Sequence, residues 1–315
     1  MIQSHHLRRD QLPKITVITP VYNCERYICE TIESVLKFKE EFDLELIVVN
    51  DGSTDETYQK IQPFQDSIRI VNQANYGEAA AVNVGISMAQ SEILLVVSAD
   101  DPLFTSELFS GVSELFDLNP ELVAAYCDWK KIDQNGDLVK VVYLPDFSLE
   151  LLLGRSQCLP GPGTFFRRSS ALEIGGRDIG WRFVGDFDFW LRLTRLGEIV
   201  HRPVLAAQWR EHEFSTSIRF RGIDMASERV GVVEDFITSV DFALTRKLKR
   251  MALGNAYYLA ARLCYFDPRV RGKYFLLKAF SSRKKWPENA KIHEVVYILL
   301  KPLSHKIINF LKGLT

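Results

Sequence analysis

Two adjacent carboxylates, Asp100 and Asp101, follow the apolar run at residues 93–97 almost directly. A short continuous apolar run is typical of a buried strand in a parallel sheet. The carboxylates then lie at the carboxyl end of that strand, where open α/β sheets bind their ligands. Two acids this close repel each other unless a cation lies between them, and oxygen ligands suit Mg²⁺ or Mn²⁺. The alternative interpretation is an exposed Asp-Asp-Pro turn that caps the next helix.

Polar loops also follow the other strands predicted in the first hundred residues. The predicted strands cover residues 15–19, 44–49, 67–71 and 93–97, and the predicted helices cover residues 25–38, 55–61 and 77–90. This alternation indicates an α/β fold with a doubly wound, largely parallel sheet and helices on both faces. Because the carboxyl ends of parallel strands meet at one edge, we expect Tyr22, Asp51 and Asp100 to face one crevice.

The regular alternation ends after residue 102. Helices are predicted at 106–118, 147–153 and 186–196, and strands at 122–129, 138–143, 198–201 and 205–209. From about residue 225 the apolar spacing is helical to the end of the chain. We therefore predict a loose leader over residues 1–13, one α/β domain over 14–222 with halves at 14–102 and 103–222, and a basic helical region over 223–315.

The composition is ordinary for a globular protein, with 47% hydrophobic and 25% charged residues. No apolar run approaches the roughly 20 residues of a membrane-spanning helix. The first residues lack the apolar core of a signal peptide. Five cysteines are scattered without a Cys-x-x-Cys pair, which argues against a disulfide framework or a zinc site. We expect reduced thiols and a cytoplasmic protein.

The charge is distributed unevenly along the chain. Residues 241–315 carry 16 Lys and Arg and 4 Asp and Glu, whereas the remainder carries 23 and 36. The last predicted helix, at 293–314, has apolar residues near helical spacing with lysines among them, and suits an interfacial helix on an anionic membrane. The alternative is a helical appendage that packs on the α/β domain, or on a second copy in a homodimer.

With these loops in place, the chain resembles a family 2 glycosyltransferase of the GT-A fold. The matching motifs, over residues 14–217, are Thr19-Pro-Val-Tyr-Asn23, Val49-Asn-Asp51-Gly-Ser-Thr-Asp55, Asn75-x-Gly77 with Asn83-x-Gly85, Ser98-Ala-Asp100-Asp101, Gly175-Gly176, Gly185-Asp186-Phe-Asp188-Phe-Trp190 and Arg210-x-His212. Seven short motifs in this order are specific. The resemblance implies transfer of a sugar from a nucleotide-sugar donor to a carbohydrate or lipid-linked acceptor, in polysaccharide or glycolipid synthesis. The default nucleotide is UDP, with dTDP and GDP open, and no nucleic acid partner is expected.

The resemblance places the donor in the half at 14–102. The residues implied in donor binding are Thr19, Pro20, Tyr22, Asp51, Asn75, Gly77, Asn83, Ser98 and Asp100. Tyr22 would lie against the base and Asp51 would accept the N3–H of the base, although Asp51 could also cap its own turn. Asp100, Asp101 and His212 would hold Mg²⁺ or Mn²⁺, which stabilises the departing diphosphate.

The resemblance places the acceptor in the half at 103–222. Asp186 is the implied general base, which takes the proton of the acceptor hydroxyl as it attacks from the face opposite the diphosphate, with inversion. Asp188 is the rival base, or an acid that the start of a helix favours. Gly163, Thr164, Asp188 and Trp190 are expected beside the acceptor, and the alternative role of Trp190 is in the core.

The chain departs from the family pattern at three positions. Ser98 replaces the first acid of the usual Asp-x-Asp motif, Val82 replaces an arginine, and Gly185 replaces a glutamate. These departures leave open a catalytically silent protein that binds nucleotide sugars or serves as a scaffold. A nucleotidyltransferase would need a Gly-rich phosphate loop with Lys or Arg after the first strand, and a dehydrogenase would need Gly-x-Gly-x-x-Gly. The sequence there is Pro20-Val-Tyr-Asn23, which favours neither.

Overall fold

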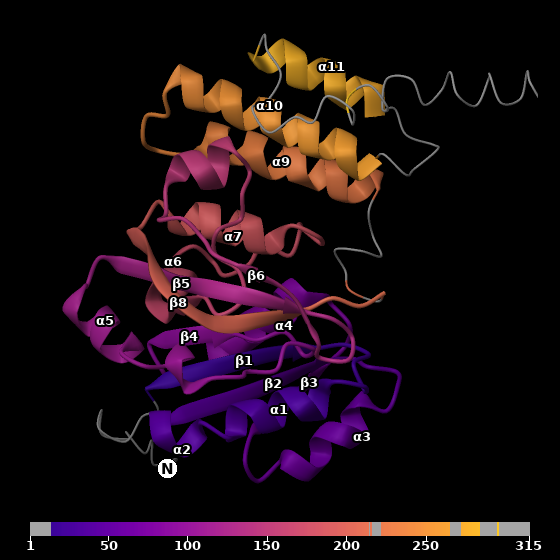
Figure 1. Cartoon of the computed structure of the whole chain (residues 1–315), viewed down its shortest axis with the longest axis vertical. Coiled ribbons are helices and arrows are strands. Elements are labelled where there is room, and N and C mark those ends of the chain that lie inside the picture. Colours follow the sequence, from indigo (N-terminus) through magenta and orange to yellow (C-terminus); the bar gives the residue numbers. More distant parts are fainter. Residues whose placement is uncertain (1–13, 214, 216–221, 265–271, 284–294, 296–315) are drawn as a thin grey trace, which may run out of the picture. The chain divides into compact units, whose positions relative to one another are not determined.

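The computed structural model describes residues 14–213, 215, 222–264, 272–283 and 295 (Figure 1). The leader at 1–13 lies outside this part of the chain, and so does the predicted last helix at 293–314 except for residue 295. The chain divides into two compact units, Met1–Phe147 with Leu159–His212, and Ser148–Cys158 with Glu213–Thr315. The predicted domain boundary at residue 222 differs from this division, which also assigns an earlier short segment to the second unit.

The first unit is built on a sheet of eight strands among the described residues. The strands are β1 (Ile15–Val21), β2 (Leu44–Asp51), β3 (Arg69–Gln73), β4 (Ile93–Val96), β5 (Leu122–Ile132), β6 (Leu138–Val142), β7 (Phe165–Arg167) and β8 (Glu198–Arg210). Their order is β3-β2-β1-β4-β7-β5-β6, with β8 paired to β5. Because β1, β2, β3 and β4 are parallel, their carboxyl ends lie at one edge. The predicted α/β sheet is confirmed.

The other half of the sheet is mixed. β7 runs antiparallel to β4 and β5, and its three residues are too few for a periodic signal, so it was not predicted. β8 runs parallel to β5 as one strand, where two strands were predicted. The predicted gap is a bulge, because the register steps from Cys127–Arg202 to Asp128–Leu205 and leaves Pro203 without a partner residue on β5. A proline has no N–H to donate, which suits a bulge.

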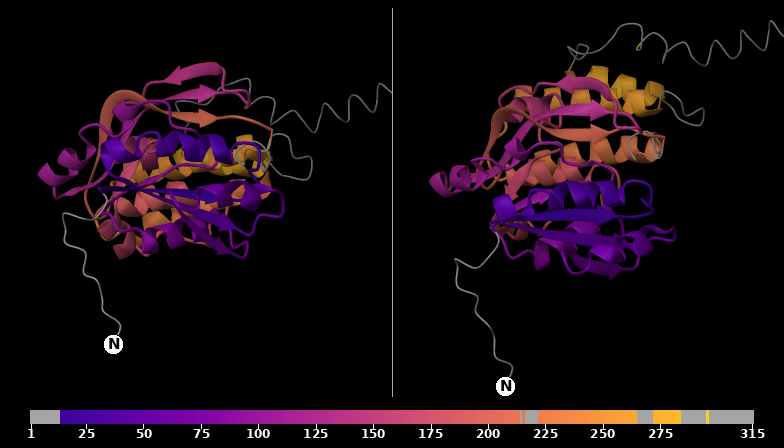
Figure 2. Two further views of the ribbon diagram at one scale, coloured as in Figure 1. Left: turned by 90° about the horizontal axis from the view of Figure 1, so that it is seen from below. Right: turned by 60° about the horizontal axis from the view of Figure 1, so that its bottom comes forward.

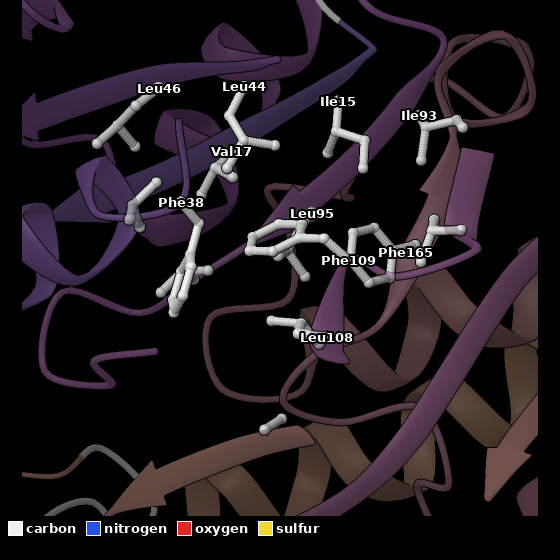
Figure 3. Packing of buried hydrophobic residues seen from close by; sticks show 14 of the residues in the cluster. Ile15, Val17, Phe38, Leu44, Leu46, Ile93, Leu95, Leu108, Phe109 and Phe165 are labelled. Atoms are coloured by element: carbon white, nitrogen blue, oxygen red, sulfur yellow. The ribbon is translucent and has the colours of Figure 1, made fainter. Parts of the chain in front are cut away.

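Helices cover both faces of the parallel strands (Figure 2). On one face, Ile15 and Val17 of β1 pack with α1 (Ile28–Leu36), which buries Ile28, Ile32 and Val35. Figure 3 shows side chains of β1, β2 and β4 gathered on this face around Phe109. On the other face lies α4 (Glu78–Met88), and a Cβ on its Gly85 would lie 2.3 Å from Ile18. The glycine therefore lets α4 approach β1 closely.

The remaining helices of the first unit are short. They are α2 (Lys39–Phe42), α3 (Thr57–Ile61), η2 (Gln62–Phe64), η3 (Ser106–Leu108), α5 (Val112–Leu118), α6 (Arg168–Glu173) and α7 (Gly185–Leu193). The helix predicted at 106–118 is divided into η3 and α5, because Gly111 has a φ of 67° and leaves the helical region. The short α6 was not predicted.

The second unit consists of helices in its described part. They are η4 (Glu150–Gly154), α9 (Ile223–Ser239), α10 (Arg246–Leu263) and α11 (Gly272–Arg283), and α10 packs against both α9 and α11. Asn255 donates a 2.5 Å hydrogen bond to the carbonyl of Gly154, which ties η4 to α10. Within the described part of the chain, every helix is too short or too polar to cross a bilayer.

Candidate active site

The loops after β1 and β2 are bonded to each other. Asn23 has a φ of 49°, a conformation that asparagine tolerates better than most residues. Its Oδ1 accepts a 2.7 Å hydrogen bond from the backbone N–H of Thr54, and its own N–H donates to the Ser53 hydroxyl at 3.0 Å. The neighbouring Tyr22 is 48% exposed, so its ring is accessible to a ligand beside these loops.

Asp51, at the end of β2, organises the loop that precedes α4. Its Oδ1 accepts from Gln73 Nε2 at 2.7 Å and from the Tyr76 N–H at 2.9 Å, and its Oδ2 accepts from the Gly77 N–H at 2.8 Å. Among the described residues, these bonds use three of the four acceptor positions of a carboxylate. The alternative role considered for Asp51 was to cap its own turn. Asn50 does this instead, because its Oδ1 accepts a hydrogen bond from the Ser53 N–H of that turn.

The loop held by Asp51 also lies against the turn after β2. A Cβ on Gly52, whose φ is 71°, would lie 2.8 Å from the backbone nitrogen of Asn75. Only glycine fits this left-handed position without strain. Asn75 and Tyr76 are exposed at the tip of the loop. The predicted donor residues Asp51, Asn75 and Gly77 are therefore brought together.

Asp100 and His212 form a pair just beyond the end of β4. The Nε2 atom of His212 lies 2.8 Å from Oδ2 of Asp100. A carboxylate and an imidazole are both ligands that Mg²⁺ or Mn²⁺ accepts, and the oxygens of a diphosphate and water can complete such a site. The donor set therefore fits a divalent cation held jointly by the chain and a diphosphate ligand.

Asp101 is oriented differently from its neighbour. Its buried carboxylate accepts a 2.7 Å hydrogen bond from the backbone N–H of Arg210, and the Ser98 hydroxyl also bonds to it. Burial, reinforced by the charge of Asp100, raises the pKa of Asp101 above its ordinary value. Among the described residues, no three His, Cys, Asp or Glu side chains are grouped to hold a metal ion. The three predicted metal ligands, Asp100, Asp101 and His212, therefore do not form a single cluster in the described structure.

Arg210 joins the Asp100–His212 pair to α1, a role that the sequence analysis missed. Its side chain is buried, its Nε donates to the carbonyl of Asp100 at 2.9 Å, and its Nη2 lies 2.7 Å from Glu30 Oε2. The Tyr27 ring lies 4.7 Å from the Arg210 guanidinium and 5.1 Å from the His212 ring. His212 lies two residues beyond the end of β8, and the short Arg210-x-His212 spacing was the signal available for this role.

Asn83 of α4 is used to hold a distant turn. Its Nδ2 donates to the carbonyl of Arg177 and its Oδ1 accepts from the Arg177 N–H, both at 2.7 Å. A Cβ on Gly176 would lie 2.3 Å from Asn83 Oδ1, so this glycine is needed for the approach. The Arg177 guanidinium in turn pairs with Glu78 at 2.7 Å. Both polar atoms of the Asn83 amide thus hold this turn, and its contact with the donor stays a prediction.

The two acids of α7 differ in their surroundings. Asp186 is exposed in the first turn, where its Oδ1 accepts a 2.7 Å hydrogen bond from the Phe187 N–H. Asp188 is buried and forms an ion pair with Arg192 at 2.6 Å. Arg192 also donates to the carbonyls of Ile174 and Gly176, so the pair fixes the glycine turn.

The other residues expected beside the acceptor are buried. Trp190 packs against Phe189 and Phe166, with ring centroids 5.0 and 5.9 Å away. Gly163 has a φ of 74°, and the Thr164 hydroxyl donates to the carbonyl of Gly161 at 2.6 Å. Thr19 and Pro20, expected at the donor, are likewise buried inside β1.

A known protein family matches the first half of this chain. The sequence at residues 16–173, half of the chain, matches the model described as Glycosyl transferase family 2. The chain belongs to glycosyl transferase family 2. The family resemblance found in the seven motifs is thereby confirmed, and so is the enzyme class, a glycosyltransferase.

This glycosyltransferase is similar to other proteins of known name or structure. It is 26% identical to an uncharacterized glycosyltransferase of Rickettsia prowazekii over 266 residues, which are 81% of this chain and 80% of the relative. The structure of S. aureus TarS 1–349 in complex with UDP-GlcNAc matches with a TM-score of 0.59 and 18% identity, over 86% of this chain and 89% of TarS 1–349. For several other relatives the matched region covers only 22% to 66% of their length.

A third similar protein is the mannosyltransferase PcManGT of Pyrobaculum calidifontis, whose structure is in complex with GDP-Man and Mn²⁺. It matches with a TM-score of 0.57 and 16% identity, over 93% of this chain and 80% of PcManGT. Both structural matches establish the GT-A fold for this glycosyltransferase.

Proposed function

We propose that this glycosyltransferase moves a sugar from a UDP-sugar to an acceptor hydroxyl, with inversion at the anomeric carbon, in polysaccharide or glycolipid synthesis. The observation that carries the proposal is the Asp100–His212 pair, 2.8 Å apart, at the same sheet edge as the loops of Tyr22 and Asp51. Ligands of open α/β sheets bind at this edge. The TarS complex with UDP-GlcNAc supports a UDP-sugar as the donor.

The donor is assigned to the loops after β1 and β2. The exposed Tyr22 ring stacks on the base, and the remaining acceptor position of Asp51 receives the N3–H of uracil. Ser98 is exposed beyond β4, and its hydroxyl oxygen, whose O–H is directed to Asp101, accepts a hydrogen bond from a ribose hydroxyl. Uracil, thymine and guanine each have a ring N–H to donate, whereas adenine has none, so Asp51 disfavours an adenine nucleotide and the choice of UDP rests on the TarS complex.

Asp100 and His212 are assigned as ligands of Mg²⁺ or Mn²⁺, with Asp101 as a supporting residue. When bound, the cation neutralises the diphosphate that departs from the sugar. The Mn²⁺ in the PcManGT complex supports a divalent metal in this fold. Arg210 holds the backbone of Asp100 and contacts Tyr27, which fixes where the ligand pair lies.

Val82 stands where the family has arginine, so any diphosphate contact of that arginine must come from another residue or from the metal. We assign this role to Arg177, which the Asn83 clamp and the Glu78 ion pair hold against α4. Its Nε is buried and has no hydrogen-bond partner in the described chain, so the guanidinium is not fully committed to acceptors of the protein.

Asp186 is assigned as the general base. It is the exposed acid of α7, whereas Asp188 is committed to Arg192. A base must reach the proton that it removes, and a buried ion-paired carboxylate does so poorly. The acceptor hydroxyl transfers its proton to Asp186 as its oxygen bonds to the anomeric carbon, and the UDP leaves from the opposite face.

The test is a panel of nucleotide sugars measured by thermal shift and by release of the nucleoside diphosphate. UDP-sugars with Mn²⁺ are expected to raise the melting temperature most, because a ligand of the native state stabilises it by mass action. Slow hydrolysis of the same UDP-sugar shows that the site is catalytic. UDP-sugar binding without turnover by any acceptor would favour the silent binding protein, and a larger shift with GDP-sugars would overturn the choice of UDP.

A further inference from the structure

The last described helix of the second unit, α11, has apolar side chains on both of its faces. Phe275, Leu276 and Ala279 are buried, and the Phe275 ring lies 6.4 Å from Tyr257 of α10. On the opposite face Tyr274, Leu277 and Phe280 are 51%, 68% and 45% exposed. Of the helices that the structure describes, α11 alone exposes three large apolar side chains. A helix that is apolar all round is normally covered on every side.

The helices of this unit also separate their charges. α10 and α11 carry eight Lys and Arg and no Asp or Glu, whereas α9 carries four acids and one arginine. The Tyr257 hydroxyl donates to Glu234 of α9 at 2.7 Å, which places acids on the α9 side of α10. Lys278 is exposed among the apolar residues of α11, with its Nζ 5.6 Å from the Tyr274 ring. The exposed apolar face therefore includes a lysine, and neither α10 nor α11 carries an acid.

We propose that the outer face of α11, formed by Tyr274, Leu277, Lys278 and Phe280, docks this enzyme on an anionic lipid bilayer. Tyrosine, phenylalanine and leucine enter the headgroup region favourably, and Lys and Arg are attracted by anionic lipids. A tyrosine ring suits this boundary because one end is apolar and the other is hydrated.

The charges favour a bilayer over a second copy of the chain. In a symmetric dimer through this face, the same surface meets itself, so the cations of α10 and α11 would approach their own copies without an acid on either helix. Juxtaposed like charges disfavour such a contact. The docking face is separate from the active site, and the proposal does not depend on the identity of the donor.

Flotation of the full-length chain with vesicles tests the proposal. We expect the protein to float at low salt with vesicles of phosphatidylcholine and phosphatidylglycerol, to stay unbound with phosphatidylcholine alone, and to be released as salt screens the charges. Leu277→Glu is expected to lower the partition coefficient about tenfold or more, and Lys278→Gln about fivefold. Leu118→Glu is the matched control, because Leu118 is 71% exposed on α5 of the first unit.

Several outcomes would overturn the proposal. They are a wild-type chain that stays unbound with anionic vesicles at low salt, Leu277→Glu protein that floats like the wild type, and equal losses for Leu277→Glu and Leu118→Glu. Tyr274→Ser adds no charge and should also reduce flotation, which guards against a result due to charge alone. If Leu277→Glu dissociates a dimer in sedimentation but floats normally, the face is an interface between copies. Unchanged melting temperatures verify that each variant is folded.

Discussion

The donor end and the acceptor end of the site hold their carboxylates in opposite ways. Asp51 accepts hydrogen bonds from three other residues, and Asp101 is buried against the backbone of Arg210. Asp186 is exposed and accepts a hydrogen bond from the next residue of its own helix. Held carboxylates position a ligand, whereas an exposed one can exchange a proton. On the proposed assignment, this difference corresponds to ligand binding by Asp51 and Asp101 and to proton transfer by Asp186.

The largest effect is expected at the exposed carboxylate. Asp186→Asn keeps the size of the side chain and removes its basicity, so kcat should fall by about a hundredfold to ten-thousandfold. The Kd for UDP should stay unchanged in calorimetry, because the donor end is intact. Asp117→Asn, at another exposed acid of the first unit, serves as the control. Near-normal turnover would move the base elsewhere and remove the contrast between the two ends.

The next effect is expected at the metal pair. A chelator and Asp100→Asn should each weaken UDP binding by about a hundredfold, because both remove the cation that bridges the chain and the diphosphate. Calorimetry with and without Mn²⁺ measures this, and the chelator should have little further effect on the variant. Equal UDP affinity in all four measurements would exclude metal bridging.

Arg210→Lys tests whether the buried donors behind this pair matter. Lysine keeps the charge but cannot reach the Asp100 carbonyl and Glu30 together. Replacement of a residue that orients a metal ligand commonly lowers the metal affinity about tenfold to a hundredfold. Titration of the variant and the wild type with Mn²⁺ in the presence of UDP measures this loss of metal affinity. A variant that loses thermal stability but keeps its Mn²⁺ affinity would make Arg210 purely structural.

The smallest effect is expected at the Tyr22 ring. Tyr22→Leu removes aromatic stacking but keeps an apolar contact, so the KM for the donor should rise roughly twofold to tenfold with kcat unchanged. Tyr22→Phe keeps the ring and should behave like the wild type. If Phe and Leu variants are equally impaired, the hydroxyl carries the contact and the stacking assignment is wrong.

The sequence predicted the parallel strands and the loops that follow them, because short continuous apolar runs and polar strand ends are local signals. It did not predict which tertiary hydrogen bonds the polar side chains of the site form. Arg210 reaches Glu30 over a separation of 180 residues, and Asn83 reaches Arg177 over 94. Such pairings arise from tertiary packing, which spacing along the chain does not contain.

Some signals were present in the sequence and were not used. Asp188 and Arg192 are four residues apart, the spacing of an ion pair on one helix face, which separates Asp188 from Asp186. Gly111 lies within the helix predicted at 106–118 and marks its break. By contrast, the three residues of β7 and the short α6 give no periodic pattern that could be read.

The bond between Asp101 and the backbone of Arg210 has a consequence for synthesis on the ribosome. The two residues are 109 positions apart, and at usual elongation rates of about 5 to 20 residues per second the donor N–H emerges roughly 5 to 20 s after the acid. During that interval the parallel strands β1 to β4 are complete, yet the acid that must be buried beside them lacks this partner. We therefore expect the Asp101 carboxylate to stay hydrated until the end of β8 has been synthesised.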